Sequence, residues 1–288
     1  MNFENITVSD VIRLGVSKMR NNIHTYYFGD DDCFVTSRYL TFYSLNLPYD
    51  FDNQIYYNSK ITKKEFNNIL NLFDKRIKQR IPTVYLTNEY WFGPLNTYFY
   101  IDKNVYITRS PIVHFLENLV KDKKNILDLC CGSGALGIIA SLLNDKCLVD
   151  LADIDEKTLK VSQKNIDKHN LKTKVKCIKS DLFKNVNKKY DLIIAVPPQV
   201  SKEEYNKRVK ESLHEPNLAY EASDNGFFYI KKIIDASPKF LNENGILVME
   251  VGNKLPKKIK ELYPDLKLEW CKFKGKDSIL KYTKSGKN

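Results

Sequence analysis

Residues 125–137 read NILDLCCGSGALG, and this stretch decides the fold. Its first five residues form a mostly apolar run that predicts a buried strand, and the residues from Gly134 to Leu143 predict a helix. The glycines between them let the backbone approach a ligand closely, and the start of a helix offers unpaired amide donors. The stretch therefore predicts a strand, a glycine-rich turn and a helix that together face a small molecule.

Strands and helices alternate from this stretch to the end of the chain. The further predicted helices are 156–169 and 226–240, and the further predicted strands are 147–152, 175–178, 190–195, 245–251 and an antiparallel pair at 267–273 and 277–282. Such alternation is typical of the α/β class, in which a doubly wound, mostly parallel sheet carries helices on both faces. We therefore predict a Rossmann-like sheet of seven strands.

The residues before this sheet predict helices. Apolar residues from Val8 to Met19 recur at helical spacing. Thr62 and Glu65 have the spacing of a capping box, which predicts the start of another helix, and Pro82 predicts its end. The N-terminal part of the chain is therefore expected to be mainly helical.

A β-hairpin is predicted at the end of this helical part. Aromatic and β-branched residues at 98–101 and 105–107 flank the turn Asp102-Lys103-Asn104. We expect two domains: 1–120, a helical substrate-recognition domain with the hairpin, and 121–288, the domain of the predicted sheet. Their boundary is expected at the charged segment KDKK, which begins at Lys121.

The composition is that of a folded, basic protein. A chain of 288 residues can bury a large core, and it has no apolar run near the roughly 18 residues that a membrane helix needs. We therefore expect a cytoplasmic protein with no membrane partner. The net charge of +11 would attract a phosphate-rich partner, and a compositional bias toward lysine explains it equally well. The six cysteines form no CxxC pair, so we expect reduced thiols and no metal site.

Three aspartates follow three predicted strands of the sheet. Asp128 ends the first, Asp153 lies 25 positions later at the end of the second, and Asp181 follows the third. The carboxyl ends of parallel strands meet at one edge, where a carboxylate binds ribose in nucleotide-binding folds. A dinucleotide suits the glycines, but Asp128 would repel its pyrophosphate, so we favour S-adenosylmethionine (AdoMet), which is cationic. The expected cofactor-binding residues are Asp128, Cys130, Cys131, Gly132, Ser133, Gly134, Asp153 and Asp181.

The fourth predicted strand is followed by Val196, Pro197, Pro198 and Gln199. Two prolines make the backbone rigid here and leave carbonyl oxygens free to accept hydrogen bonds. At this point the sequence resembles the AdoMet-dependent methyltransferases that act on amide or amino nitrogens, whose motif is NPPY. We therefore expect the catalytic residues to be these four, with valine and glutamine in place of asparagine and tyrosine.

Further segments extend the resemblance across the chain. In order they are Arg80 to Thr87, Trp91-Phe92, Phe99 to Asp102, Arg109 to Ile112, DLCCGSG, SDLF, His214-Glu215-Pro216 and MEVGN. They are similar to bacterial protein-(glutamine-N5) methyltransferases, most of all to the branch that modifies large-subunit ribosomal protein L-three. The resemblance implies a class I methyltransferase fold, AdoMet as cofactor, this ribosomal protein as partner and methylation of a glutamine amide nitrogen. It also implies that Arg109, His214, Glu215 and Pro216 bind the substrate.

The changed motif leaves several interpretations open. In the family, the asparagine oxygen and the carbonyl of the first proline accept the two hydrogens of the substrate amide, and Val196 has no acceptor. The chain is then a slow enzyme, in which the Gln199 carbonyl replaces that acceptor, or a silent relative that still binds AdoMet and the ribosomal protein. A nucleic-acid amino-methyltransferase and a non-catalytic ribosome-assembly factor are two further hypotheses. The positive charge implies at most a weak contact with ribosomal RNA.

Overall fold

The computed structural model describes residues 5–22, 32–49 and 53–286. The chain divides into two compact units. The helical unit comprises Met1–Asp102 with Val209–His214, and the sheet unit comprises Lys103–Arg208 with Glu215–Asn288. The predicted separation of substrate recognition from catalysis at residue 120 stays a prediction.

The described residues of the helical unit include the helices α1 (Val8–Arg20), α2 (Cys33–Ser44), α3 (Lys63–Lys78) and α4 (Thr83–Thr87). The capping box that the sequence predicts is present, because the backbone amide of Thr62 donates to Glu65 Oε2 at 2.7 Å and the amide of Glu65 donates to Thr62 Oγ1 at 3.3 Å. The apolar faces of these helices enclose a core that includes Val11, Leu40 and Phe73. Helix α3 ends before the predicted Pro82, because Arg80 has a positive φ of 58°.

A buried ion pair explains why Val209–His214 belongs to the helical unit. Glu211 Oε1 lies 3.1 Å from Arg76 Nη1 and 2.6 Å from Arg80 Nη2, and the side chains of Glu211 and Arg76 are fully buried. In the same segment, Nε2 of His214 lies 2.9 Å from the carbonyl oxygen of Gln79. Removing one partner of such a pair leaves a buried charge uncompensated, so this segment is firmly attached.

The predicted hairpin exists, but its strands are different from those predicted. Strand β1 (Glu89–Phe92) pairs with β2 (Thr97–Tyr100) in antiparallel register, and the turn between them is the 3-10 segment Gly93–Leu95 followed by Asn96. Residues 105–107 form no strand. Their alternation of buried and half-buried side chains imitates one, but the amide of Ile107 donates to the Glu215 carboxylate at 3.1 Å and not to a neighbouring strand.

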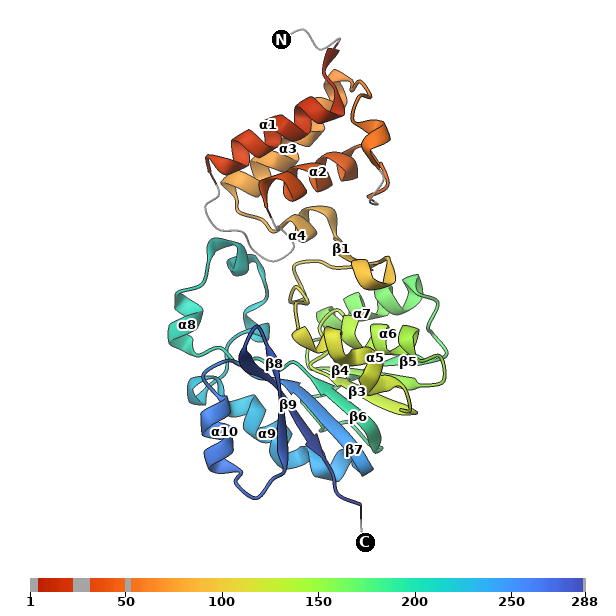
Figure 1. The fold of residues 1–288 in the computed structure, drawn as a ribbon, viewed down its shortest axis with the longest axis vertical. Coiled ribbons are helices and arrows are strands. Elements are labelled where there is room, and N and C mark those ends of the chain that lie inside the picture. Colours follow the sequence, from red (N-terminus) through yellow and green to blue (C-terminus); the bar gives the residue numbers. More distant parts are fainter. Residues whose placement is uncertain (1–4, 23–31, 50–52, 287–288) are drawn as a thin grey trace. The chain divides into compact units, whose positions relative to one another are not determined.

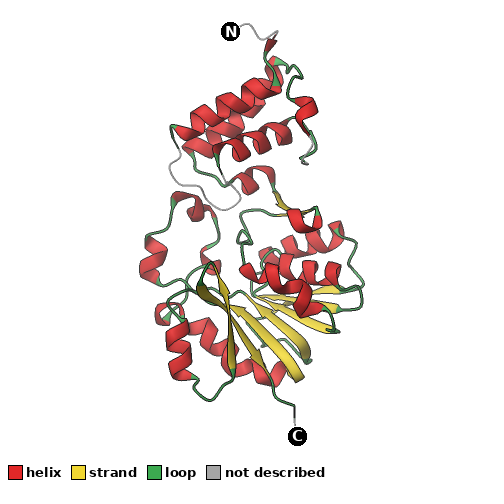
Figure 2. Ribbon diagram, viewed as in Figure 1, coloured by secondary structure: helices red, strands yellow, loops and turns green. Residues whose placement is uncertain are grey.

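The sheet unit contains the seven-stranded sheet that the sequence predicts, in the order β5-β4-β3-β6-β7-β9-β8. The first five strands in this order are parallel, and β9 is antiparallel to both β7 and β8. Their bounds are β3 (Asn125–Leu129), β4 (Leu148–Asp153), β5 (Val175–Lys179), β6 (Tyr190–Ala195), β7 (Leu241–Glu250), β8 (Leu268–Phe273) and β9 (Lys276–Thr283). Figure 2 shows the strands as one twisted layer with helices around it.

Helices cover both faces of this sheet, as expected. Figure 1 shows α5, α6 and α7 grouped by β3, β4 and β5, with α9 and α10 on the other side of the sheet. The helices of this unit are α5 (Leu116–Val120), α6 (Ala135–Leu143), α7 (Glu156–Lys168), α8 (Lys202–Asn206), α9 (Phe228–Phe240) and α10 (Pro256–Leu262), with 3-10 segments at Pro111–Phe115, Asn217–Ala219 and Asp224–Gly226. No helix of the described ranges is long and apolar enough to cross a membrane.

The two faces of the sheet are packed by alternate residues of each strand. Leu129, Ala195 and Met249 belong to a buried cluster with Ile230 and Ile233 of α9. The residues between them in the strands face the other way. Helix α6 packs against that second face so closely that a Cβ on Gly137 would lie 2.4 Å from the Leu151 side chain. This close packing fixes the turn that precedes the helix.

Candidate active site

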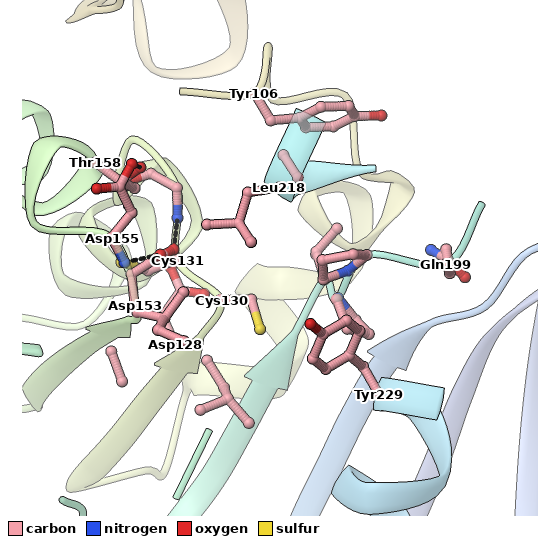
Figure 3. A pocket seen from close by; sticks show the side chains of 18 of the residues that line it. Tyr106, Asp128, Cys130, Cys131, Asp153, Asp155, Thr158, Gln199, Leu218 and Tyr229 are labelled. Atoms are coloured by element: carbon pink, nitrogen blue, oxygen red, sulfur yellow. Dashed lines mark hydrogen bonds between the residues drawn. The ribbon is translucent and has the colours of Figure 1, made fainter. Parts of the chain in front are cut away.

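A cavity opens at the carboxyl ends of β3, β4 and β6 in the sheet unit. It brings together most of the residues that the sequence selects, namely Arg109, Asp128, Cys130, Cys131, Gly132, Asp153, Asp181, Val196, Pro197, Pro198, Gln199 and Pro216. Figure 3 shows Asp128, Asp153 and Asp155 on one side of the cavity and Tyr229 on the other.

The loop after β3, Cys130–Gly134, lies on the side of the cavity where Asp128 and Asp153 are. It is called the cofactor loop below. Cys130 and Gly132 both have positive φ values, 59° and 57°. A Cβ on Gly132 would meet no atom within 4 Å, so the backbone here faces open space. A ligand can therefore approach this turn as closely as the glycine pattern predicts.

Asp128 is buried at the base of the cofactor loop. One of its carboxylate oxygens, Oδ2, accepts a hydrogen bond from the amide of Gly137 at 2.9 Å and so satisfies a free donor of the first turn of α6. Burial, opposed by this hydrogen bond and reinforced by nearby Asp153, raises the pKa of Asp128 to about 8. A cation bound in the cavity would favour the ionised form of this carboxyl.

Asp153 ends β4 and holds the cofactor loop through its side chain. Its Oδ2 accepts from the amide of Gly132 at 3.1 Å, and its Oδ1 accepts from the amide of Asp155 at 3.1 Å. Burial raises the pKa of Asp153, against the effect of these hydrogen bonds. Asp181 also lines the cavity, but this residue is exposed. The three aspartates thus share one cavity in three different environments.

Two predicted cofactor-binding residues lie behind the cavity and not on its lining. Ser133 is buried, its hydroxyl lies 3.1 Å from Thr108 Oγ1, and its carbonyl accepts from Asn165 at 2.9 Å. A Cβ on Gly134 would collide with the Leu151 side chain at 2.7 Å. Both residues shape the loop from beneath. Their predicted contact with the cofactor stays a prediction.

The two cysteines of the cofactor loop line the cavity with their thiols protonated. Burial and the neighbouring aspartates raise the pKa of both Cys130 and Cys131 well above the usual value for a thiol. The Cys131 sulfur lies 3.7 Å from the hydroxyl of Ser162, which in turn donates to the Gly132 carbonyl at 2.7 Å. The side chains next to the exposed backbone of Gly132 are therefore small and uncharged.

The loop after β6, Val196–Gln199, is called the proline loop below. Gln199 is turned away from the centre of the cavity (Figure 3), and its Oε1 accepts a hydrogen bond from the amide of Gly252 at 2.6 Å. A Cβ on Gly226 would lie only 2.3 Å from the carbonyl oxygen of Gln199. The proline loop is thus held from two sides, and the Gln199 side-chain oxygen already has a backbone partner.

The predicted substrate-binding residues fall into two groups. Arg109 lines the cavity and donates to both oxygens of Glu215, at 2.7 and 2.9 Å, and to the hydroxyl of Tyr220 at 2.7 Å. Pro216 also lines the cavity, whereas Glu215 lies behind it and His214 belongs to the helical unit. The structure gives Arg109 and Glu215 a role in supporting the cavity wall, and their contact with a substrate stays a prediction.

Several lining residues were missed by the sequence reasoning, among them Tyr106, Leu218, Tyr229 and Glu250. Tyr229 lies in the first turn of α9, after Gly226, where no local motif indicates a role. Glu250 lies within the segment MEVGN, which marks the end of a strand but not the direction of its side chains. The strand register could have found Glu250, since the carboxyl ends of neighbouring parallel strands share one edge.

The chain matches known proteins over nearly its whole length. Residues 112–268 match the model of the methyltransferase small domain. The chain is 34% identical over 286 residues to the ribosomal protein uL3 glutamine methyltransferase of Francisella tularensis, covering 96% of this chain and 90% of the relative. It is 31% identical over 281 residues to the protein of the same name from Neisseria meningitidis, covering 95% of this chain and 91% of the relative.

Solved structures agree on the fold. The catalytic domain of hMettl16, in a crystal structure with MAT2A 3'UTR hairpin 6, has a TM-score of 0.53 and 16% identity, covering 77% of this chain and 82% of the other. A second crystal structure of that domain, with hairpin 1, covers 86% of this chain and 93% of the other at the same TM-score and 14% identity. The predicted class I methyltransferase fold is therefore confirmed, and the chain belongs to the family of ribosomal protein uL3 glutamine methyltransferases.

Proposed function

We propose that this protein transfers a methyl group from AdoMet to the side-chain amide nitrogen of a glutamine in ribosomal protein uL3, the protein L-three of the large subunit. The observation that carries the proposal is the similarity to uL3 glutamine methyltransferases over 96% of the chain, which includes both units. The helical unit would then recognise the protein substrate, in the cytoplasm where ribosomes are made. Contact with ribosomal RNA is limited to the attraction that a net charge of +11 provides.

The residues of the cavity fit AdoMet. The open backbone at Gly132 leaves space for the amino-acid part of the cofactor beside Asp128, whose carboxylate suits a cation. Asp153, at the end of β4, would accept hydrogen bonds from ribose hydroxyls. Asp181 lies at the same edge of the sheet, where it would meet the adenine end.

The methyl-accepting side consists of the proline loop and Tyr229. When bound, AdoMet supplies an electrophilic methyl group on a sulfonium. The carbonyl oxygen of Pro197 accepts one hydrogen of the substrate amide and thereby directs the nitrogen toward the cofactor. The ring of Tyr229 offers the aromatic face that Gln199 lacks. Orientation and electrostatic stabilisation by fixed groups are sufficient for such a transfer and need no covalent intermediate.

A transfer assay tests this proposal. The protein is incubated with AdoMet labelled in its methyl group and with either unmodified uL3 or bare ribosomal RNA, and the label is located by mass spectrometry. The Val196→Asn, Gln199→Tyr double variant, which restores the family motif, is assayed in parallel. We expect label on one glutamine of uL3.

Three contrary outcomes have different meanings. Label on RNA alone would overturn the protein substrate. Label on uL3 from the double variant only would identify a silent member of the family. No label from either protein on either substrate, when AdoMet binding is intact by calorimetry, would overturn the proposed reaction.

A further inference from the structure

The substrate amide has two hydrogens, and the proline loop provides an acceptor for only one of them. The Pro197 carbonyl is available, but Val196 is a hydrocarbon side chain without lone pairs. The Gln199 side-chain oxygen accepts a hydrogen bond from the Gly252 amide at 2.6 Å, and this side chain is turned away from the centre of the cavity (Figure 3). An amide hydrogen left without a partner is costly where water does not reach it. An acceptor on another element that reaches the same place would avoid this cost.

Strand β7 brings a carboxylate to that place. β6 and β7 are parallel neighbours in which Ala195 is paired with Met249. Carrying this register one residue further sets Val196 beside Glu250, the last residue of β7, and side chains paired in this way point to the same face of a sheet. Both residues line the cavity. The strand spacing of roughly 4.8 Å puts the Glu250 carboxylate within side-chain reach of a substrate that contacts Val196.

One oxygen of the Glu250 carboxylate has no partner in the protein. This oxygen, Oε2, is buried and has no hydrogen-bond partner among the residues that the structure describes. Buried polar atoms in proteins are nearly always paired, so an acceptor in the lining of a cavity that has no partner in the protein is available to a donor on a ligand.

The charges around Glu250 determine its protonation. Burial raises the pKa of Glu250, while the Ser110 hydroxyl and the positive charge of Arg109 lower it. Tyr106 faces the same carboxylate, and burial raises the pKa of this phenol to about 12, so it is neutral. The Glu250 carboxylate is therefore a stronger base than an exposed glutamate, and Arg109 is the cation that opposes its protonation.

We propose that Glu250 is a catalytic residue that accepts the second hydrogen of the substrate amide, in place of the asparagine that Val196 replaces. The inference rests on the proposed function. The amide nitrogen forms its bond to the methyl carbon while the carbon–sulfur bond breaks, and the electron pair of that bond stays on sulfur. The nitrogen then carries one proton too many, and this proton passes to Oε2 of Glu250, which later returns it to solvent.

Substitutions at Glu250 and Val196 test this role together. Glu250→Leu removes the acceptor at similar volume, Glu250→Gln keeps an acceptor oxygen but no base, and Val196→Asn restores the family's own acceptor. Glu243→Leu, an exposed glutamate of the same strand, is the matched control. We measure kcat and KM on uL3, the AdoMet dissociation constant by calorimetry, and thermal unfolding for each variant.

We expect Glu250→Leu to lower kcat by about 10²- to 10³-fold, the usual cost of deleting a fixed hydrogen-bonding group at a reacting centre. AdoMet affinity should stay within about twofold, and Glu250→Gln should lie between the wild type and Glu250→Leu. Adding Val196→Asn to Glu250→Leu should raise kcat at least about tenfold above that of Glu250→Leu alone. At saturating AdoMet, the fall of kcat at acidic pH that the wild type shows should be absent in Glu250→Gln.

A kcat for Glu250→Leu within about threefold of the wild type, or no gain from adding Val196→Asn to a folded Glu250→Leu protein, would overturn the role of Glu250. A silent wild type that Val196→Asn activates would overturn it as well and leave the proposed function standing. If neither protein methylates uL3 while both bind AdoMet, the proposed function itself fails.

Discussion

The cofactor loop and the proline loop leave neighbouring strands and face one cavity, but they are built differently. The cofactor loop is held by an aspartate at a strand end, since the amide of Gly132 donates to Asp153 of β4. In the proline loop, the side chain of Gln199 accepts from the Gly252 amide, and the side chain of Val196 has no polar atom. A strand-end aspartate, a type of residue that the sequence pattern marks, therefore holds the first loop, whereas the second is held by a backbone amide, which no residue type marks.

This difference shows where a local motif gives a misleading result. The motif VPPQ alone indicates that a hydrogen-bond acceptor is missing, because Val196 replaces the asparagine of the family motif. With the sheet assembled, the unpartnered oxygen of Glu250 and the ring of Tyr229 face the same space. If Glu250 accepts the second hydrogen of the amide, a neighbouring strand compensates for the substitution at Val196.

The largest effect on cofactor binding is expected from removing the carboxylate of Asp153, which accepts a hydrogen bond from the Gly132 amide of the cofactor loop. Asp153→Ala should weaken AdoMet binding about 100-fold, because it removes a charged acceptor for ribose and releases the Gly132 amide. Isothermal titration calorimetry measures this loss. Asp145→Ala, an exposed aspartate of the same unit, is the control and should bind normally. Undiminished binding by Asp153→Ala would show that this side of the cavity does not hold the ribose.

The buried carboxyl of Asp128 should make cofactor binding depend on pH. Its pKa of about 8 means that it is protonated at neutral pH in the free protein, and a cationic ligand favours the ionised form. AdoMet binding should therefore release a proton, and affinity should rise up to about tenfold per pH unit below pH 8. Calorimetry in buffers of different ionisation enthalpy counts the released protons. Asp128→Asn should release none from this site, and equal proton release by both proteins would contradict the assignment.

The same pKa affects stability in the opposite direction. Because the folded pKa of Asp128 lies above the ordinary value of 3.8, its protonated form stabilises the free protein fully below pH 3.8. This contribution decreases as the pH rises and is lost as the pH passes through about 8. Urea unfolding at several pH values should show this decrease in the wild type, and a flatter dependence in Asp128→Asn.

The smallest effect is expected at Tyr229, which tests the compensation on the methyl-accepting side. Tyr229→Ala should raise the KM for uL3 by about five- to tenfold, because a packing face of order 1 kcal/mol is lost. Tyr229→Phe keeps that face and should stay within about twofold. Steady-state kinetics on uL3 measures both. A loss in Tyr229→Phe equal to that in Tyr229→Ala would instead assign the function of this residue to its hydroxyl.

Elements with a strong local signal could be predicted from the sequence. The capping box at Thr62 and the buried parallel strands such as Tyr190–Ala195 are specified by nearby residues, so the helix start and the sheet were correct. The hairpin partner was wrong, because the alternation at residues 105–107 reflects packing, and Ile107 donates to Glu215, which lies 108 positions away. Bonds of such long sequence separation leave no periodic signal.

The same limit applies to the candidate site. The aspartates that end β3 and β4 are recognisable because strand ends of a parallel sheet meet at one edge. Glu250 and Tyr229 reach the cavity through strand register and through the start of α9, and neither has a motif of its own. The direction of Gln199 depends on Gly226 and Gly252, which lie 27 or more positions further along the chain.

The protonated cysteines of the cofactor loop have a practical consequence. The thiolate form of cysteine reacts with alkylating reagents and peroxides, and the raised pKa of Cys130 and Cys131 keeps that form scarce. A cavity with two adjacent thiols should therefore tolerate iodoacetamide and mild oxidants that inactivate enzymes with ionised cysteines. The aspartates that line the cavity thus also protect the sulfur atoms beside them.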